Sequence, residues 1–142
     1  MNVLFVCTGN TCRSPMAAAL FNKIAVEKDL DVRIESAGLF ANDGEPASEN
    51  AVAAMKDYGV DLSEHRAKTV NSELLEQVDL ALTMTASHKM MLLEYLGDKV
   101  HTLCEFAETS GDIPDPYGGD LEEYKICAEK IYNALLKVAE KI

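Results

Sequence analysis

Short apolar runs alternate with amphipathic stretches along this chain, and the alternation predicts its secondary structure. Residues 2–6 form an apolar, β-branched and aromatic run whose length is typical of a buried parallel strand. Alternating or apolar segments at 31–36, 78–84 and 100–103 predict three more strands. Strands separated by helical segments are typical of an α/β fold with a parallel sheet.

Helix start and stop signals fall between these strands. Ser14 followed by Pro15 predicts an N-cap and a first helical residue, and good helix formers follow. Asp120 with Glu123 resembles a capping box, and the apolar stripe behind it indicates core packing. We therefore expect a single open, twisted four-stranded parallel sheet with helices on both faces. The other two helices are predicted at 48–58, ended by Gly59, and at 85–96, capped near Thr85.

Length and composition predict one domain over residues 1–142. Apolar residues make up 48% of the chain, which is enough for a packed core, yet no apolar run is long enough to span a bilayer. No secretory signal opens the sequence, so we expect a cytoplasmic location. The four cysteines are then expected to be reduced, and they lack the clustered spacing of a metal site. They are Cys7, Cys12, Cys104 and Cys127.

The formal net charge of −11 disfavours polyanions as partners. Its field repels nucleic acid and anionic membranes at long range, so we expect neither as a partner. Solubility explains the charge, although an acidic surface also tolerates or attracts basic protein substrates. A local phosphate site remains compatible with it.

The segment 7–15, Cys-Thr-Gly-Asn-Thr-Cys-Arg-Ser-Pro, carries the candidate chemistry. It begins at the carboxyl end of the first strand and ends at a helix N-terminus, so its backbone N–H groups lack strand or helix acceptors and can converge on an anion. Gly9 is expected to adopt the unusual backbone angles of such a loop. We predict that residues 8–14 bind phosphate.

Cys7 and Arg13 are the reactive side chains of this segment. A cysteine beside a helix N-terminus and an arginine ionises readily, so Cys7 is expected as a thiolate nucleophile. Arg13 offers a planar fork of N–H donors that matches two phosphate oxygens. The alternative is a buried structural cysteine and a solvated arginine, which leaves the rest of the run unexplained.

These residues closely resemble the low-molecular-weight protein tyrosine phosphatase family, whose phosphate loop has the pattern Cys-x-Gly-Asn-x-Cys-Arg-Ser-Pro. Every fixed position of that pattern is present. The resemblance covers nearly the whole chain, because the family's segments at 36–38, 65–67, 80–84 and 115–118 follow in the expected order.

The resemblance implies a mechanism with two displacements at phosphorus. Cys7 attacks to form a phosphocysteine, Asp115 protonates the leaving group, and water then releases inorganic phosphate with Asp115 as base. Arg13 and the backbone N–H groups stabilise the transferring group, so neither a metal nor a cofactor is expected. On composition alone, Asp115 is better explained as a turn residue before Pro116.

Supporting roles also come from the resemblance. Asn10, Ser14, Ser36 and His65 match a hydrogen-bond network that holds the loop, and each has an ordinary structural explanation as a cap or a buried polar group. Cys12 matches a cysteine that protects Cys7 by forming a disulfide with it, and small-residue packing is the alternative. His88, His101, Cys104 and Cys127 are expected to be structural or surface residues.

The variable positions bear on the substrate. Thr11 stands where tyrosine-directed members carry a bulky aliphatic residue, and it resembles the bacterial protein-arginine phosphatase branch. Gly118 follows Asp-Pro-Tyr where those members commonly carry a second tyrosine. Phe40 and Tyr117 are candidates for the pocket rim. These features favour phosphoarginine in proteins, with phosphotyrosine as the alternative.

Other functional classes fit less well. A phosphocysteine carrier of the phosphotransferase type needs neither Arg13 nor Asp115. An arsenate reductase would need a downstream redox pair that Cys104 and Cys127 do not match. A noncatalytic phosphoprotein-binding module requires Asp115 to lie away from the site. The expectation is a monomeric enzyme acting on phosphorylated proteins.

Overall fold

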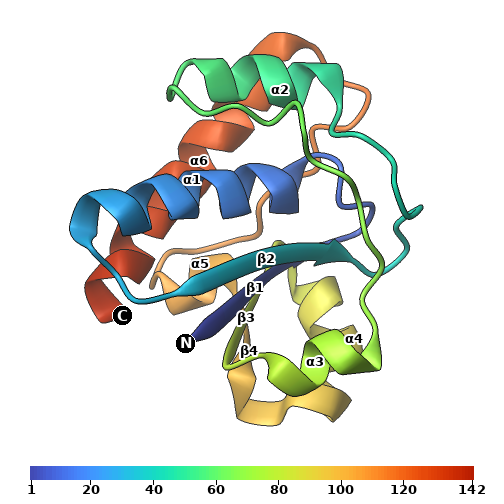
Figure 1. The fold of residues 1–142 in the computed structure, drawn as a ribbon, viewed down its shortest axis with the longest axis vertical. Coiled ribbons are helices and arrows are strands. Elements are labelled where there is room, and N and C mark those ends of the chain that lie inside the picture. The colour runs from blue at the N-terminus through green and yellow to red at the C-terminus, as the bar shows by residue number, and fades with distance from the viewer.

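Four parallel strands form one sheet in the order β2-β1-β3-β4 in the computed structural model, which describes residues 1–142 (Figure 1). The open parallel sheet expected from the sequence is confirmed. At the carboxyl end of β1, Cys7 pairs with Gly38 of β2, and Val6 pairs with Thr83 of β3. The strands are β1 (Asn2–Cys7), β2 (Arg33–Gly38), β3 (Leu80–Thr83) and β4 (Val100–Thr102).

Helices cover both faces of the sheet, as expected (Figure 1). Alternate residues of β1 point to opposite faces, so Phe5 packs in the larger core and Leu4 in the smaller one. Phe5 meets Phe21 of the first helix edge to face at 5.7 Å between ring centres. The larger core lies under α1 (Arg13–Lys28), α2 (Glu49–Lys56), α5 (Leu103–Phe106) and α6 (Leu121–Lys141), and the smaller under α3 (Ser72–Gln77) and α4 (Ala86–Leu96).

The start of α1 differs from the prediction. Ser14 is not the N-cap, because the helix already begins at Arg13 and Cys12 occupies the cap position without a side-chain cap bond. The Ser14 hydroxyl contacts Cys7 and Asn10 instead. Pro15 therefore lies inside the first turn, where its missing N–H costs no intrahelical bond.

Other boundaries shift by a few residues. The second strand begins and ends two residues later than predicted, and the third is shorter at both ends. The fourth strand stops at Thr102 because Thr102 and Glu105 form a reciprocal capping box that starts α5, a helix absent from the prediction. The helix α3, capped by Asn71, was also not predicted. Asp120 caps α6 by accepting from the Glu123 N–H, without the reciprocal bond of a capping box.

The remaining caps agree with the sequence pattern. Ser48 caps α2, Thr85 caps α4, and Gly59 follows α2 with a left-handed φ of 71°. The 3-10 turn Gly97–Lys99 links α4 to β4. None of the helices combines the length and the apolar character that a bilayer-spanning helix needs.

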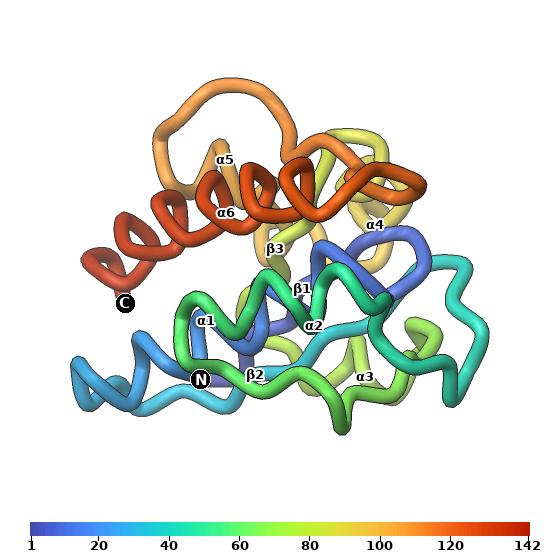
Figure 2. The backbone as a smooth tube through the Cα atoms, turned by 90° about the horizontal axis from the view of Figure 1, so that it is seen from above, coloured from blue at the N-terminus to red at the C-terminus, as the bar shows by residue number.

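The strand order places a crevice at the carboxyl end of β1. From β1 the chain crosses through α1 to β2 on one side, whereas β3 lies on the other side of β1. Ligands of open α/β sheets bind at such a switch point. Both chain ends lie away from it, at the opposite end of the sheet (Figure 2). The loop after Cys7 therefore occupies the position where the fold itself favours a ligand.

Candidate active site

The loop between β1 and α1 presents backbone N–H groups that have no acceptor in the protein. None of the N–H groups of residues 8–14 donates to a backbone carbonyl or to a side chain. The first turn of α1 lies directly behind them, and its positive end adds to their field. Unpaired N–H groups at a helix N-terminus are what an anion-binding loop needs, and phosphate binding by residues 8–14 stays a prediction.

Asn10 holds the turn of this loop. Its φ of 56° is left-handed, which asparagine tolerates better than most residues. Its side-chain amide donates to Ser14 Oγ at 2.8 Å and to Ser36 Oγ at 3.0 Å, and its Oδ1 accepts from the Lys68 N–H at 3.0 Å. The expectation for Gly9 was wrong, because Gly9 has no positive φ and the left-handed residue is Asn10.

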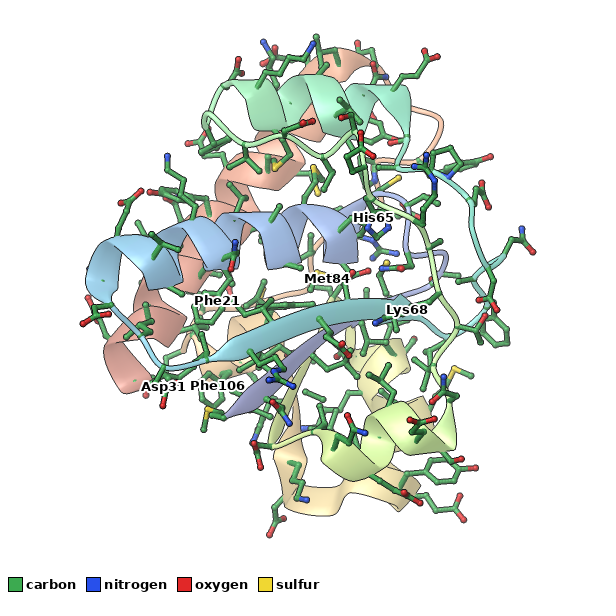
Figure 3. All side chains as sticks on the ribbon, in the orientation of Figure 1. Phe21, Asp31, His65, Lys68, Met84 and Phe106 are labelled. Atoms are coloured by element: carbon green, nitrogen blue, oxygen red, sulfur yellow. The ribbon has the colours of Figure 1, made fainter.

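His65 completes the support from the far side of Asn10. Its Nε2 lies 2.7 Å from the Asn10 carbonyl oxygen, which can only accept, so Nε2 carries the proton and donates. Burial lowers the pKa of His65, although the bond to Asn10 acts in the opposite direction. His65 and Lys68 lie near the carboxyl end of β2 (Figure 3). The structure thus brings together all four residues predicted for the network.

Cys7 ends β1 with its side chain buried against the loop. Its Sγ lies 2.9 Å from Ser14 Oγ, which in turn accepts from the Asn10 amide. When Cys7 is a thiolate, the Ser14 hydroxyl donates to it, because a thiolate can only accept. Ser14 therefore links the fixed Asn10 side chain to the sulfur.

Gly38 is required for this loop to pass the end of β2, a requirement that the sequence analysis missed. A Cβ built on Gly38 would lie 2.5 Å from the Thr8 carbonyl oxygen and 2.9 Å from the Asn10 nitrogen, both of them backbone atoms. At Gly9, by contrast, the nearest neighbour of a Cβ would be Thr11 Oγ1 at 3.8 Å. The close approach of two backbones therefore occurs at Gly38.

Arg13 and Asp115 meet across the loop, although they are far apart in the sequence. Arg13 is almost fully buried and donates from Nη1 to the Ile113 carbonyl at 3.0 Å, while its Nη2 lies 3.6 Å from Asp115 Oδ2. Asp115 is 53% exposed, and its Oδ1 accepts from the Tyr117 N–H at 3.0 Å. Asp115 is thus both the turn residue and a carboxylate beside the site.

The loop that carries Asp115 is anchored to the sheet and to α6. The Ile113 N–H donates to the Met84 carbonyl at the end of β3, and Asp112 accepts from the Ala86 N–H. Lys130 of α6 donates to the Asp112 carbonyl at 2.7 Å. These bonds anchor the segment that holds Asp115 beside the loop of residues 8–14.

A pocket of about 240 Å³ opens above the loop. Phe40 and Tyr117 line its rim and are 67% and 77% exposed, as a rim requires. Asn42 and Glu45 also line it, and no sequence pattern pointed to either, since they belong to no motif of the chain. The other lining residues are Cys7, Thr8, Gly9, Thr11, Cys12, Arg13 and Asp115.

Cys12 lines the pocket, and its sulfur makes polar contacts with α6 and with the cap of α2. Its Sγ lies 3.3 Å from the Tyr124 hydroxyl and 3.5 Å from Ser48 Oγ. Burial, with the bond to Cys12, raises the pKa of Tyr124 to about 12. All four cysteines are free. Pairing of Cys12 with Cys7 therefore stays a prediction beside the packing role that these contacts describe.

The remaining ionisable residues have different surroundings. His88 is buried, and its Nε2 lies 2.9 Å from Thr8 Oγ1, a contact with the phosphate loop that the sequence analysis missed. His101 is partly exposed beside Glu105. Burial raises the pKa of Cys127 to about 12. No group of three or more His, Cys, Asp or Glu side chains is placed to hold a metal ion.

Comparisons with known proteins agree with this geometry. Residues 2–142 match the family model "Low molecular weight phosphotyrosine protein phosphatase". The chain is 41% identical to a protein-arginine-phosphatase of Bacillus subtilis, over 100% of this chain and 97% of that protein.

Solved structures are similar over nearly their full length. A low-molecular-weight protein tyrosine phosphatase from T. tengcongensis has a TM-score of 0.96 at 48% identity, covering 100% of this chain and 99% of that one. A cysteine-to-serine mutant of the YwlE arginine phosphatase, with a phosphorylated active-site serine, has a TM-score of 0.94 at 40% identity, covering 99% and 95%.

Replacing Gly38 with alanine tests the close approach of β2 to the loop. We expect Gly38→Ala to lower the free energy of unfolding by about 1–3 kcal/mol, because its Cβ must displace backbone atoms. Urea titration measures this change. Gly9→Ala is the matched control and should leave stability nearly unchanged; equal losses in both variants would contradict the assignment.

The buried His88 predicts a pH dependence of stability. Burial, with the Arg13 charge nearby, lowers the pKa of His88 from 6.5 to about 4. Between these values the unfolded chain binds a proton that the folded chain does not, so the free energy of unfolding falls as pH decreases from about 6.5 to about 4. Urea titrations across this window should give a shallower slope for His88→Gln than for wild type. The interpretation would be contradicted if the pH dependence of the free energy of unfolding were unchanged in His88→Gln but weaker in His101→Gln.

Proposed function

Because this chain belongs to the low-molecular-weight phosphotyrosine protein phosphatase family, we propose that it hydrolyses phosphorylated protein side chains through a cysteinyl-phosphate intermediate. The observation that carries the proposal is the set of unpaired N–H groups in residues 8–14, a segment that lines one pocket together with the buried Cys7. Such preorganised donors stabilise the charge of a transferring phosphoryl group without reorganisation.

In the first step the Cys7 thiolate attacks phosphorus in line with the leaving group. The sulfur–phosphorus bond forms as the bond from phosphorus to the substrate nitrogen or oxygen breaks. The leaving atom takes the electron pair and receives the proton of Asp115. Arg13 and the loop N–H groups bind the equatorial oxygens, and the Ile113 carbonyl keeps the guanidinium in place.

In the second step water attacks the cysteinyl-phosphate. Asp115, now a carboxylate, takes the proton of the water, the phosphorus–sulfur bond breaks, and Cys7 returns to a thiolate as inorganic phosphate leaves. The contact of 2.9 Å between Ser14 Oγ and Cys7 Sγ supports this step, since a donated hydrogen bond makes the sulfur a better leaving group. A carrier or a binding module would not need a carboxylate beside Arg13.

Phosphoarginine is the favoured substrate group. An arginine phosphatase and a tyrosine phosphatase are both similar to this chain, so the lining of the pocket must distinguish the two substrates. Arg13 lines the pocket as a buried cation, whereas the exposed Glu45 lines it as a carboxylate. Phosphoarginine matches these charges, because its negative phosphoryl group can face Arg13 while its guanidinium faces the carboxylate. Thr11 adds a hydroxyl that can accept a guanidinium N–H.

The aromatic part of the pocket supports the same conclusion. A phenyl ring is bound by apolar and aromatic walls, and here Phe40 and Tyr117 are the aromatic residues of the rim. Gly118 contributes no side chain where a second aromatic residue would add contact area. Phosphotyrosine remains the alternative, as the name of the T. tengcongensis protein illustrates.

The wider biology of the enzyme follows from its charge and size. We propose that it works as a cytoplasmic monomer on phosphorylated proteins, with nucleic acid and membranes excluded as partners by the net charge of −11. The acidic surface favours substrate segments rich in basic residues. Cys12 is proposed to protect Cys7 through a reversible disulfide.

Substitution of the two proposed catalytic residues tests the mechanism. On a chromogenic aryl phosphate, Cys7→Ser should lower kcat by roughly 10⁴-fold or more, because it removes the nucleophile. Asp115→Asn should lower kcat by about 10²–10⁴-fold, because it removes the proton donor. Asp43→Asn, an exposed change of equal charge outside the pocket lining, is the control. Unimpaired turnover of Cys7→Ser would refute the mechanism.

Thr11→Ile tests the substrate assignment. The wild type should show a higher kcat/KM on a phosphoarginine peptide than on the matched phosphotyrosine peptide, and Thr11→Ile should shift this ratio toward phosphotyrosine by about tenfold, because it removes one hydrogen bond to a charged group. Steady-state kinetics on the peptide pair measure the ratio. A clear preference of the wild type for phosphotyrosine would sink the arginine assignment and leave the mechanism intact.

A further inference from the structure

A buried histidine contacts the phosphate loop from a helix that the mechanism above does not use. His88 lies in the first turn of α4 and is only 6% exposed, and its Nε2 is 2.9 Å from Thr8 Oγ1. Its other ring nitrogen, Nδ1, is buried without a hydrogen-bond partner. Thr8 is exposed and lines the pocket. Its hydroxyl therefore connects the buried ring to the site of phosphate binding.

The ring of His88 is neutral at physiological pH. Burial and then the Arg13 charge lower its pKa to about 4, while Asp112 and Asp115 act in the opposite direction. His88 lies in the first turn of α4, where its backbone N–H donates to the cap residue Thr85. The positive end of that helix also disfavours a positive charge on the His88 ring. A neutral imidazole carries one N–H and one acceptor nitrogen.

The position of that single proton decides what Thr8 offers to a bound phosphate. With the proton on Nε2, the ring donates to Thr8 Oγ1, and the hydroxyl proton of Thr8 is left for the pocket. With the proton on Nδ1, Thr8 must donate to Nε2, and only oxygen lone pairs face the anion. A proton on Nδ1 would also leave a buried N–H without an acceptor. Buried N–H groups without a partner are rarer in proteins than buried acceptors without one.

We propose that His88 is a positioning residue whose Nε2–H donates to Thr8 Oγ1, so that the Thr8 hydroxyl donates its own proton to an oxygen of the bound phosphoryl group. The inference rests on the proposed function, because it takes residues 8–14 as the phosphate loop. Thr8 then adds a side-chain donor to the backbone N–H groups of that loop, and His88 orients it without touching the substrate.

The tautomer is measured directly by long-range ¹H–¹⁵N NMR of the histidine rings in the wild-type protein at neutral pH. Loss of one set of ring signals in His88→Gln assigns the residue among the three histidines. The expected result is a protonated Nε2 and a bare Nδ1. A proton on Nδ1 overturns the proposal, and this measurement decides it even where larger substitutions at His88 unfold the protein.

A double-mutant cycle tests the positioning role. Thr8→Val keeps the shape of the side chain and should lower kcat/KM, and weaken inhibition by inorganic phosphate, by about tenfold. His88→Met should lower kcat/KM about fivefold in the wild type and not at all in the Thr8→Val background. His88→Gln keeps an N–H donor near the position of Nε2 and should recover most of the loss.

The controls separate this proposal from a structural role and from the proposed function. His101→Met, at a partly exposed histidine outside the pocket, should leave kcat/KM unchanged. An equal loss from His88→Met in both backgrounds, or no loss from Thr8→Val, overturns the proposal. Calorimetric titration of the same variants with inorganic phosphate needs no turnover, so it tests His88 and Thr8 even if the chain hydrolyses no phosphoprotein.

Discussion

The site depends on one constraint, which is that the N–H groups of residues 8–14 stay unpaired within the protein. Unpaired backbone groups are normally costly, and a loop that displays them tends to relax onto its own carbonyls. Asn10 prevents this, because a left-handed turn at this residue is held by hydrogen bonds to Ser14, Ser36, Lys68 and His65. Three separate parts of the chain therefore fix one loop.

The same arrangement separates the charges of the pocket. Arg13 is buried, and the Ile113 carbonyl ties it to the loop that also carries Asp115. This hydrogen bond thus helps to set the distance between the cation proposed to bind phosphate and the proposed proton donor. Because Glu45 adds a carboxylate at the rim, the pocket changes from positive inside to negative outside, an order that suits a phosphorylated guanidinium better than a phosphorylated phenol.

Local patterns in the sequence determined the order of the elements and the core of the chemistry. The apolar run before Cys7, the segment through Pro15 and the alternation of strands and helices were enough to predict a parallel sheet with an anion-binding loop at the end of its first strand. The motif with Asp115 could be assigned a catalytic role only through family resemblance, because Asp-Pro by itself is better explained as a turn signal.

Tertiary contacts decided the rest. The sequence pattern indicates Ser14 as an N-cap, yet in the fold its hydroxyl lies between Asn10 and Cys7, and α1 starts at Arg13, two residues before the predicted start. Glu45 and His88 belong to no motif, and they reach the pocket and the loop because the crossovers after β2 and β3 return to the same edge of the sheet. Sequence patterns encode periodicity and local turns, whereas a hydrogen bond between residues 80 positions apart exists only after the strands have paired.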